Sequence, residues 1–167
     1  INAEMPVSGL AGVTQIEVQV IAPYDGSVIA TLELADAEEL EQALQTAAEL
    51  FGDRSRWLSR GQRREILERT AAICEDEFEE IVETAAREGG KPLLDTRAEI
   101  IRGIEGIRHA ITEMSTSGGG EIPMGLNAAS DGKIAYTFRE PLGIVAAVSA
   151  FNHPFNLIVH QVIPAVA

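Results

Sequence analysis

The chain has 167 residues, a formal net charge of −13 and a single cysteine. This length suits one domain with a hydrophobic core, and a content of 46% hydrophobic and 23% charged residues is typical of folded, water-soluble proteins. The negative charge argues against nucleic-acid binding through a general electrostatic field, because a phosphate backbone would be repelled. No apolar run is long enough to span a bilayer, so we expect neither nucleic acid nor a membrane as a partner.

Cys74 is the single cysteine, which excludes an internal disulfide and fits a reducing, cytoplasmic location. It lies beside Ile73 in the apolar stripe of a predicted helix, and no cationic neighbour is present to lower its pKa. We therefore expect a buried structural cysteine, not a nucleophile. His109 and His160 are single histidines on predicted helices, and we predict no metal site.

The first predicted elements are an antiparallel strand pair and a helix. Apolar and polar residues alternate over 16–20 and 28–34, the pattern of strands with one buried face, and turn-forming residues connect the two runs. Asp36 lies three residues before Glu39, which resembles a capping box. Helical spacing of apolar residues then predicts a helix that runs to about Phe51.

Two longer helices are predicted next. Ser59, with Gln62 three residues later, marks the start of one helix, which the apolar stripe extends to Gly89-Gly90. Pro92 suits the first turn of the following helix, which ends at the glycine run 118–120. Two internal glycines weaken the propensity of this last helix.

Strand patterns return after residue 120. Alternation on both sides of Asp131-Gly132 predicts a β-hairpin that closes at this dipeptide. Residues 142–148 form a continuous apolar run, which is typical of a strand buried on both faces of a parallel sheet. Pro154 then suits the first turn of a helix packed on that sheet.

The segment 141–167 contains no Asp, Glu, Lys or Arg. Charged residues normally occupy the surface, so we expect this segment to be buried. It ends in an apolar run without a polar stop or a helix C-cap, from which we expect the fold to be incomplete in this chain.

Four short motifs occur in order along these elements. They are EGGKPL at 88–93, REPLGIV at 139–145, SAFNHP at 149–154 and IPAVA at 163–167. With the order of the elements, they resemble the N-terminal portion of the NAD(P)-dependent aldehyde dehydrogenase family. The resemblance covers nearly the whole chain from about Val18.

The resemblance implies an α/β fold of the aldehyde dehydrogenase type, incomplete in this chain. Residues 1–120 would form the N-terminal strand pair and helices of the cofactor-binding domain, and 121–140 the β-hairpin of an oligomerisation arm. Residues 141–167 would form the first strand and helix of a Rossmann-like parallel sheet. Because this arm exchanges strands between subunits in the family, a homodimer or homotetramer is implied.

Asn152 is the candidate catalytic residue. It follows the predicted strand at its carboxyl end, where open α/β sheets bind ligands, and a carboxamide there can donate to developing negative charge. In the resembled family the matching asparagine donates to the oxyanion formed when a cysteine thiolate attacks the aldehyde. Asparagine is also a strong N-cap residue, so Asn152 could instead cap the helix at Pro154, and both roles can coexist.

The candidate cofactor-binding residues match one wall of the family's NAD or NADP site; they are Val148, Ser149, Ala150 and Phe151. Ala150 stands where the family usually has proline, and Phe151 stands where it usually has tryptophan. Phenylalanine keeps the flat apolar face but lacks the indole N–H. His153 replaces a common aromatic residue, and it either lines the substrate funnel or is buried and bonded to the backbone.

The function implied by the resemblance is oxidation of an aldehyde to its carboxylic acid with NAD or NADP. The style of the motifs favours a small polar aldehyde or semialdehyde as substrate. The family's nucleophilic cysteine and general-base glutamate lie downstream of these motifs, so we expect this chain alone to be inactive. Two alternatives stay open: a non-enzymatic oligomerisation or interaction module that uses the hairpin, and an acyl-phosphate reductase of similar fold.

Overall fold

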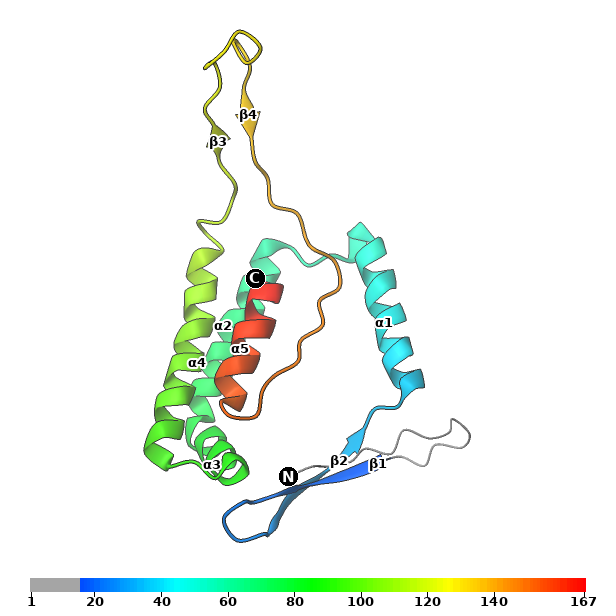
Figure 1. Ribbon diagram of the computed structural model, residues 1–167, viewed down its shortest axis with the longest axis vertical. Helices are drawn as coiled ribbons and strands as arrows, with labels where there is room; N and C mark the ends of the chain where they lie inside the picture. The colour runs from blue at the N-terminus through cyan, green and yellow to red at the C-terminus, as the bar shows by residue number, and fades with distance from the viewer. Residues whose placement is uncertain (1–15) are drawn as a thin grey trace.

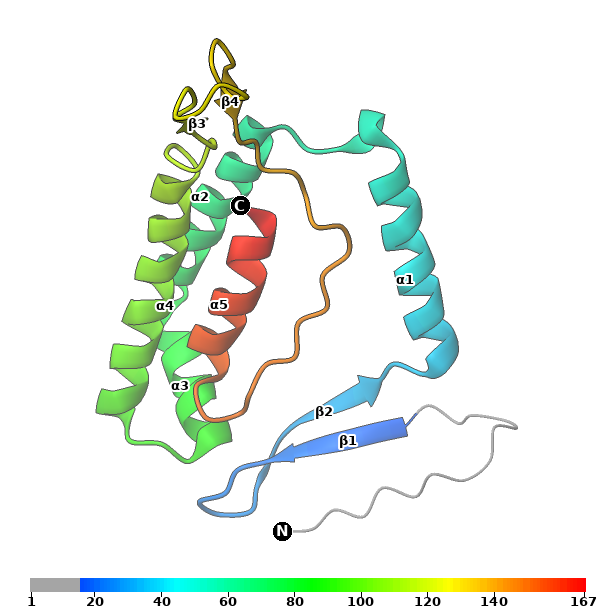
Figure 2. The same cartoon turned by 45° about the horizontal axis from the view of Figure 1, so that its top comes forward.

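The computed structural model describes residues 16–167 and consists of two small sheets and a group of helices (Figure 1). The first 15 residues of the predicted segment 1–120 lie outside the described part. Three long helices, α2, α4 and α5, run side by side, and α3 crosses one end of them (Figures 1 and 2). Helix α1 stands apart from this group, and a hairpin extends away from the end of α4.

Strands β1 (Ile16–Ile21) and β2 (Val28–Leu34) form the predicted antiparallel pair, with Val18 opposite Leu32. The prediction of one buried face is wrong for this structure, because Val18 is 41% exposed and Leu32 is also exposed. Alternation of apolar and polar residues indicates a strand with one face suited to burial, but it does not show that the face is covered. Within the described residues, no second sheet or helix covers this pair extensively.

Helix α1 (Ala37–Gly52) begins at the predicted capping box. The Asp36 carboxylate accepts from the Glu39 N–H at 2.8 Å, and the Glu39 carboxylate accepts from the Asp36 N–H at 3.0 Å. This reciprocal pair satisfies donors that the first helical turn would leave free. A short 3-10 turn, η1 (Arg54–Arg56), then leads towards α2.

Helices α2 (Arg60–Asp76) and α3 (Phe78–Gly89) replace the single long helix predicted over this region. The predicted start is confirmed by a capping box between Ser59 and Gln62, and the predicted stop is confirmed by Gly90, whose φ is 61°. The prediction of one continuous helix is wrong, because the chain leaves helical geometry at Glu77.

The break has a cause in packing. Helix α4 (Leu93–Glu113) contacts both α2 and α3. Leu67 of α2 belongs to one buried cluster with Ile107, and Val82 of α3 belongs to a second cluster with Ile100. The bend allows the two helices to pack on different parts of α4, and such tertiary packing overrides local helix propensity.

Helix α5 (Pro154–Val166) packs against α4 at two glycines, and it begins at the predicted Pro154. A Cβ atom at Gly103 would overlap the ring of Phe155, and one at Gly106 would lie 3.3 Å from Cγ1 of Val159. The glycines that weaken α4 as an isolated helix therefore permit close approach of α5.

Strands β3 (Glu121–Ile122) and β4 (Ala135–Tyr136) form the predicted hairpin, but its paired part is short. The predicted closure at a two-residue Asp131-Gly132 turn is wrong, since residues 123–134 separate the paired strands. Gly132 does adopt a positive φ of 68° within this wider loop. The hairpin projects beyond the helices (Figure 1).

Residues 142–148 do not form the predicted buried strand. They connect the hairpin to α5 without strand pairing, and Leu142 and Val148 are 97% and 88% exposed. A parallel strand needs neighbours for its backbone bonds and cover for its side chains. Among residues 16–167, none of the other strands pairs with this segment.

None of the described helices is both long enough and apolar enough to cross a membrane.

Candidate functional site

The sequence-predicted site residues form one exposed strip immediately before α5. Val148, Ser149, Ala150, Phe151 and Asn152 are all exposed, and the Phe151 side chain is 89% exposed. The strip is fastened to α5 at one end, where Nε2 of Gln161 donates to the Val148 carbonyl at 2.8 Å. The apolar side chains and the Asn152 side chain are thus available to a ligand in this structure.

Asn152 is not the cap of α5. The N-cap position is His153, and its side chain makes no capping bond. The N-cap interpretation of Asn152 is therefore wrong. Its backbone carbonyl instead accepts from Nζ of Lys91 at 3.0 Å.

Helix α5 takes its cap from another helix. Oε1 of Glu99, in α4, accepts from the Phe155 N–H at 3.1 Å and from the Asn156 N–H at 3.2 Å. These are first-turn donors that have no partner within their own helix, and a carboxylate beside them also complements the helix dipole. Glu99 is 0% exposed, so this charge is held entirely inside the protein.

Lys91 and His153 complete the cluster around Glu99. Nζ of Lys91 donates to Oε2 of Glu99, and Nδ1 of His153 lies 3.3 Å from the same oxygen and 3.4 Å from Nζ of Lys91. Lys91 thus links Glu99 to the Asn152 carbonyl. The interpretation of His153 as buried and bonded to the backbone is wrong, because its side chain is half-buried and contacts Glu99 and Lys91. Its place in a substrate funnel stays a prediction.

The pKa of Glu99 reflects two opposing influences. Burial raises it, because the charged form loses water. The hydrogen bonds from Lys91 and from the Asn156 N–H, the Lys91 charge and the contact with His153 lower it, and they outweigh burial. The net pKa lies below the ordinary carboxyl value, so Glu99 is ionised at neutral pH.

Cys74 has the surroundings of an unactivated thiol. It is only partly buried, which is less than predicted, and it packs against both core clusters. Burial raises the pKa of its thiol, and the carboxylates of Glu77 and Glu75 raise it further. A raised pKa leaves little thiolate at neutral pH.

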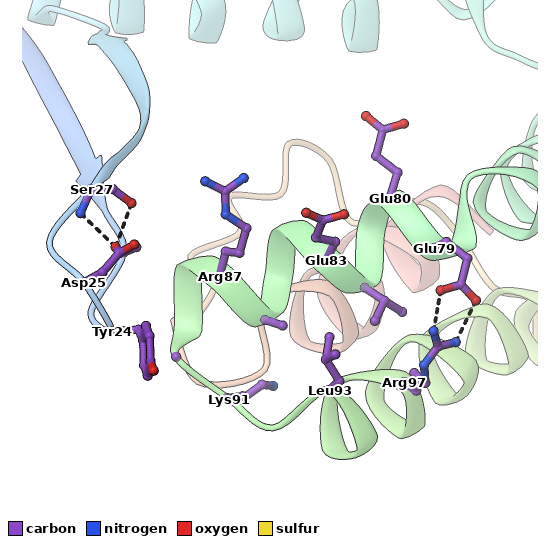
Figure 3. Close-up of a pocket in the computed structure, with 14 residues that line it drawn as sticks. Tyr24, Asp25, Ser27, Glu79, Glu80, Glu83, Arg87, Lys91, Leu93 and Arg97 are labelled. Carbon is purple, nitrogen blue, oxygen red and sulfur yellow. Dashed lines mark hydrogen bonds and ion pairs between the residues drawn. The ribbon is translucent and has the colours of Figure 1, made fainter.

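A pocket of about 940 Å³, with Lys91 among its lining residues, lies between the β1–β2 turn, α3 and the start of α4 (Figure 3). Several charged side chains line it, and some of them have partners. Arg97 forms a two-bond pair with Glu79, and Asp25 accepts from the backbone and hydroxyl of Ser27 at 2.9 and 2.7 Å (Figure 3). Within residues 16–167, no group of three or more His, Cys, Asp or Glu could hold a metal ion.

Sequence reasoning missed Glu99. Its signal was present, because Glu99 lies on the same helical face as Thr96 and Gly103, both buried. A carboxylate on the inward stripe of an amphipathic helix requires a partner, since buried charges are paired. Apart from Lys91, its partners lie far along the chain at 153–156, so no local motif indicates them.

Comparison with known proteins identifies the relatives of this chain. The family model for the aldehyde dehydrogenase family matches residues 12–167. The chain is 30% identical, over 165 residues, to aspartate-semialdehyde dehydrogenase 1 of Pseudomonas canavaninivorans, covering 98% of the chain and 35% of that protein.

Two solved structures share its fold. Aldehyde dehydrogenase 21 of Physcomitrella patens, in complex with the reaction product succinate, matches with a TM-score of 0.84 at 30% identity, covering 97% of the chain and 33% of that protein. Glyceraldehyde-3-phosphate dehydrogenase of Methanocaldococcus jannaschii, complexed with NADP, matches with a TM-score of 0.80 at 31% identity, covering 92% and 32%.

The chain spans about a third of the length of these relatives. The predicted α/β architecture of the aldehyde dehydrogenase type is confirmed for the portion of the fold that the chain contains, although the strand over 142–148 is not formed. The family match extends over nearly the entire sequence. The chain belongs to the aldehyde dehydrogenase family.

Proposed function

We propose that the protein containing this chain is an aldehyde dehydrogenase that oxidises an aldehyde to the carboxylic acid with NAD or NADP. The observation that carries the proposal is an exposed Asn152 at the entrance to α5, in a chain that matches the family over residues 12–167. The relatives supply the reaction class, and the geometry supports a specific role for this residue.

Asn152 acts as the oxyanion donor in this proposal. Its exposed carboxamide can donate to negative charge that develops on the aldehyde oxygen, and it needs no particular protonation state to do so. The Phe155 and Asn156 N–H groups at the start of α5 are already bonded to Glu99. Those donors are engaged, whereas the side chain of Asn152 is exposed, and in this proposal it donates to the oxyanion.

The strip Val148, Ser149, Ala150 and Phe151 forms one wall of the cofactor site in this proposal. Its exposed apolar side chains suit the flat rings and ribose of NAD or NADP, which accepts a hydride from the substrate when bound. Residues 141–167 contain no Lys or Arg, so this wall does not neutralise the cofactor phosphates. Support for the cofactor class comes from the NADP complex of the Methanocaldococcus jannaschii relative.

The proposed substrate is a small polar aldehyde or semialdehyde. The support comes from three of the relatives, whose names specify aspartate semialdehyde, the product succinate and glyceraldehyde 3-phosphate. Each of these molecules is short and carries an anionic group. We propose the same class for this protein.

The proposed organisation follows the family pattern. Residues 1–120 belong to the cofactor-binding domain, 121–140 to an oligomerisation arm, and 141–167 begin the Rossmann-like core. The hairpin that projects from α4 supports the arm, and the expected assembly is a homodimer or homotetramer (Figure 1). A cytoplasmic location stays a prediction from the single cysteine.

Turnover measurements test the function. The full-length protein, given NAD or NADP and a panel of short aldehydes with and without a carboxylate or phosphate, should form NAD(P)H and acid in equal amounts. The 167-residue chain alone should be inactive, because it supplies one donor and one cofactor wall. Absence of turnover by the full-length protein, or sustained turnover by the chain alone, would contradict the proposal.

Asn152→Ala tests the assigned role directly. Removal of one oxyanion donor should lower kcat by about 100- to 1000-fold while KM for the aldehyde changes little, because the lost interaction forms only in the transition state. Asn156→Ala is not a suitable control because Asn156 is buried at the Glu99 contact. Asn127→Ala, in the hairpin loop, removes an exposed carboxamide that accepts from the Ser130 N–H of the same loop, and it should retain kcat where sedimentation shows that assembly is unchanged.

A further inference from the structure

Lys91 occupies an unusual position between a buried carboxylate and the turn that carries Asn152. Its Nζ atom donates to Glu99 Oε2 and to the Asn152 carbonyl oxygen, the latter at 3.0 Å. Lys91 lies in the loop between α3 and α4, so its side chain connects this loop and α4 to a turn 61 residues along the chain. Its side chain is only partly exposed.

We propose that Lys91 and Glu99 are positioning residues for Asn152, which hold the backbone of its turn in the place from which the carboxamide donates. This inference rests on the proposed function, because it assigns a purpose to the restraint only if Asn152 is the oxyanion donor. Neither residue contacts the reacting atoms in this scheme.

The restraint has two parts, one on each side of the turn. Oε1 of Glu99 holds the start of α5 through the N–H groups of Phe155 and Asn156, and Lys91 holds the Asn152 carbonyl. The two parts are joined, because Lys91 is itself bonded to Glu99. The turn is therefore held at two points. Lys91 binds the carbonyl oxygen of Asn152, and Glu99 binds N–H groups of α5 that begin three residues later.

The position of a hydrogen-bond donor has a large effect on the rate of a reaction that it assists. A donor must lie within a few tenths of an ångström of its best position, and a shift of 1 Å can cost about 100-fold in rate. Fixing the carbonyl and the following helix limits the range over which the Asn152 side chain moves.

A merely structural ion pair would behave differently. Loss of a structural pair lowers stability and the amount of folded enzyme, but the folded molecules retain their kcat. Loss of a positioning residue lowers kcat in folded molecules, and it does so only while the group that it positions is present. The coupling between Lys91 and Asn152 therefore separates the two roles.

The test uses the full-length protein and a double-mutant cycle of Lys91→Met and Asn152→Ala. Lys91→Met alone should lower kcat by about 10- to 100-fold, with KM for the aldehyde changed by less than about 2-fold. In the Asn152→Ala background the same change should lower kcat by less than about 2-fold, because the donor has already been removed. Lys91→Arg, which keeps a cationic donor, should recover part of the lost kcat.

Arg97→Met is the matched control. Arg97 is a nearby cation on α4 whose two-bond pair with Glu79 joins α4 to α3, and neither member of that pair contacts Asn152. It should retain the kcat of the unchanged protein. A second readout is independent of turnover: Glu99→Gln should accelerate amide hydrogen exchange at Phe155 and Asn156, with exchange in the middle of α2 unchanged.

The outcomes are distinct. If the Lys91→Met and Asn152→Ala effects multiply, or if Lys91→Met raises only KM, the positioning role is overturned while the proposed function stands. Unchanged exchange at Phe155 and Asn156 in Glu99→Gln overturns the part assigned to Glu99. If the unchanged full-length protein oxidises none of the aldehydes, the proposed function fails first, and the catalytic purpose of Lys91 and Glu99 fails with it.

Discussion

Glu99 is a charged side chain without exposed surface, and the polar atoms that face it come from Lys91 and from residues 153–156. Desolvating a carboxylate is costly, so its burial is tolerated only because Lys91 and two backbone N–H groups replace the lost water. The same contacts connect α4, the loop before it and α5.

Glu99→Ala should lower the free energy of unfolding by about 3–5 kcal/mol, because it leaves a partly buried lysine and two helix N–H groups without their acceptor. Urea unfolding of the full-length protein measures the change. Glu79→Ala removes a carboxylate from an exposed pair with Arg97 and should change the unfolding midpoint little. Equal effects of the two substitutions would contradict a special role for the buried pair.

The pH dependence of stability should carry the signature of Glu99. Burial opposes its ionisation, but hydrogen bonds and the Lys91 charge set its folded-state pKa below the ordinary value of 4.5. The folded state therefore binds the Glu99 proton less readily than the unfolded state. The resulting stabilisation is fully present above 4.5 and is lost as the pH falls through the lower folded-state pKa.

We therefore expect the urea midpoint of the unchanged protein to fall more steeply below pH 4.5 than that of Glu99→Gln. Between that pH and neutrality, the titration of Glu99 should add nothing to the difference in urea midpoint between the two proteins. Parallel curves at acid pH would show that Glu99 titrates alike in the folded and unfolded states.

At the scale of the element, the contact between α4 and α5 depends on missing side chains. The ring of Phe155 occupies the space beside Gly103, and it packs against both core clusters, so it has little room to move. Glycine in a helix normally costs stability relative to alanine. Here the close approach of the two helices offsets that cost.

Gly103→Ala should lower the free energy of unfolding by about 1–3 kcal/mol, because the new methyl group overpacks the α4–α5 contact. Gly61→Ala is the control, since the nearest group to its new Cβ is the Ser59 hydroxyl at 3.9 Å. That substitution should be neutral or stabilising by about 0.5–1 kcal/mol, as expected for alanine in an open helical position. A stabilising Gly103→Ala would contradict the packing.

The sequence predicted those elements that are specified locally. The boxes at Asp36 and Ser59 involve residues three positions apart, so the starts of α1 and α2 could be read directly. The break at Glu77 depends on how α2 and α3 pack on α4, and the residues at the break do not indicate it. The strand over 142–148 was predicted from its apolar run, but a strand also requires a partner that pattern alone cannot supply.

The candidate site shows the same division. Motifs located Asn152 and the strip before it, and their catalytic and cofactor roles stay predictions. Glu99 and Lys91 were not linked to Asn152, because the contacts join positions 8 to 61 residues apart. Such pairings follow from the tertiary arrangement of α4 and α5, which periodicity does not describe.

At the scale of the whole molecule, the hairpin is the part that extends farthest from the helices (Figure 1). Its paired part is β3 and β4, and Ile122 lies opposite Ala135. Most of its side chains are exposed, including those of Leu126 and Phe138. An extended, exposed hairpin of this kind is well suited to pairing with another subunit.

Replacing residues 123–134 by Asn-Gly should reduce the assembly of the full-length protein. The replacement joins Ile122 to Ala135 through a two-residue loop, which is compatible with their observed pairing. Sedimentation velocity should show a smaller species than the unchanged protein gives. A Gly/Ser loop of the original length serves as the control for loop chemistry, and an unchanged sedimentation coefficient would argue against the arm.

The capping of α5 by Glu99 has a consequence for how the region can vary. A helix normally commits the residue before its first turn to Ser, Thr, Asp or Asn. Here the acceptor is Glu99 of α4, so position 153 does not need a capping side chain, and the residue there is histidine. The side chains that precede α5 are therefore free to suit a bound molecule, because Glu99 of α4 caps the helix in their place.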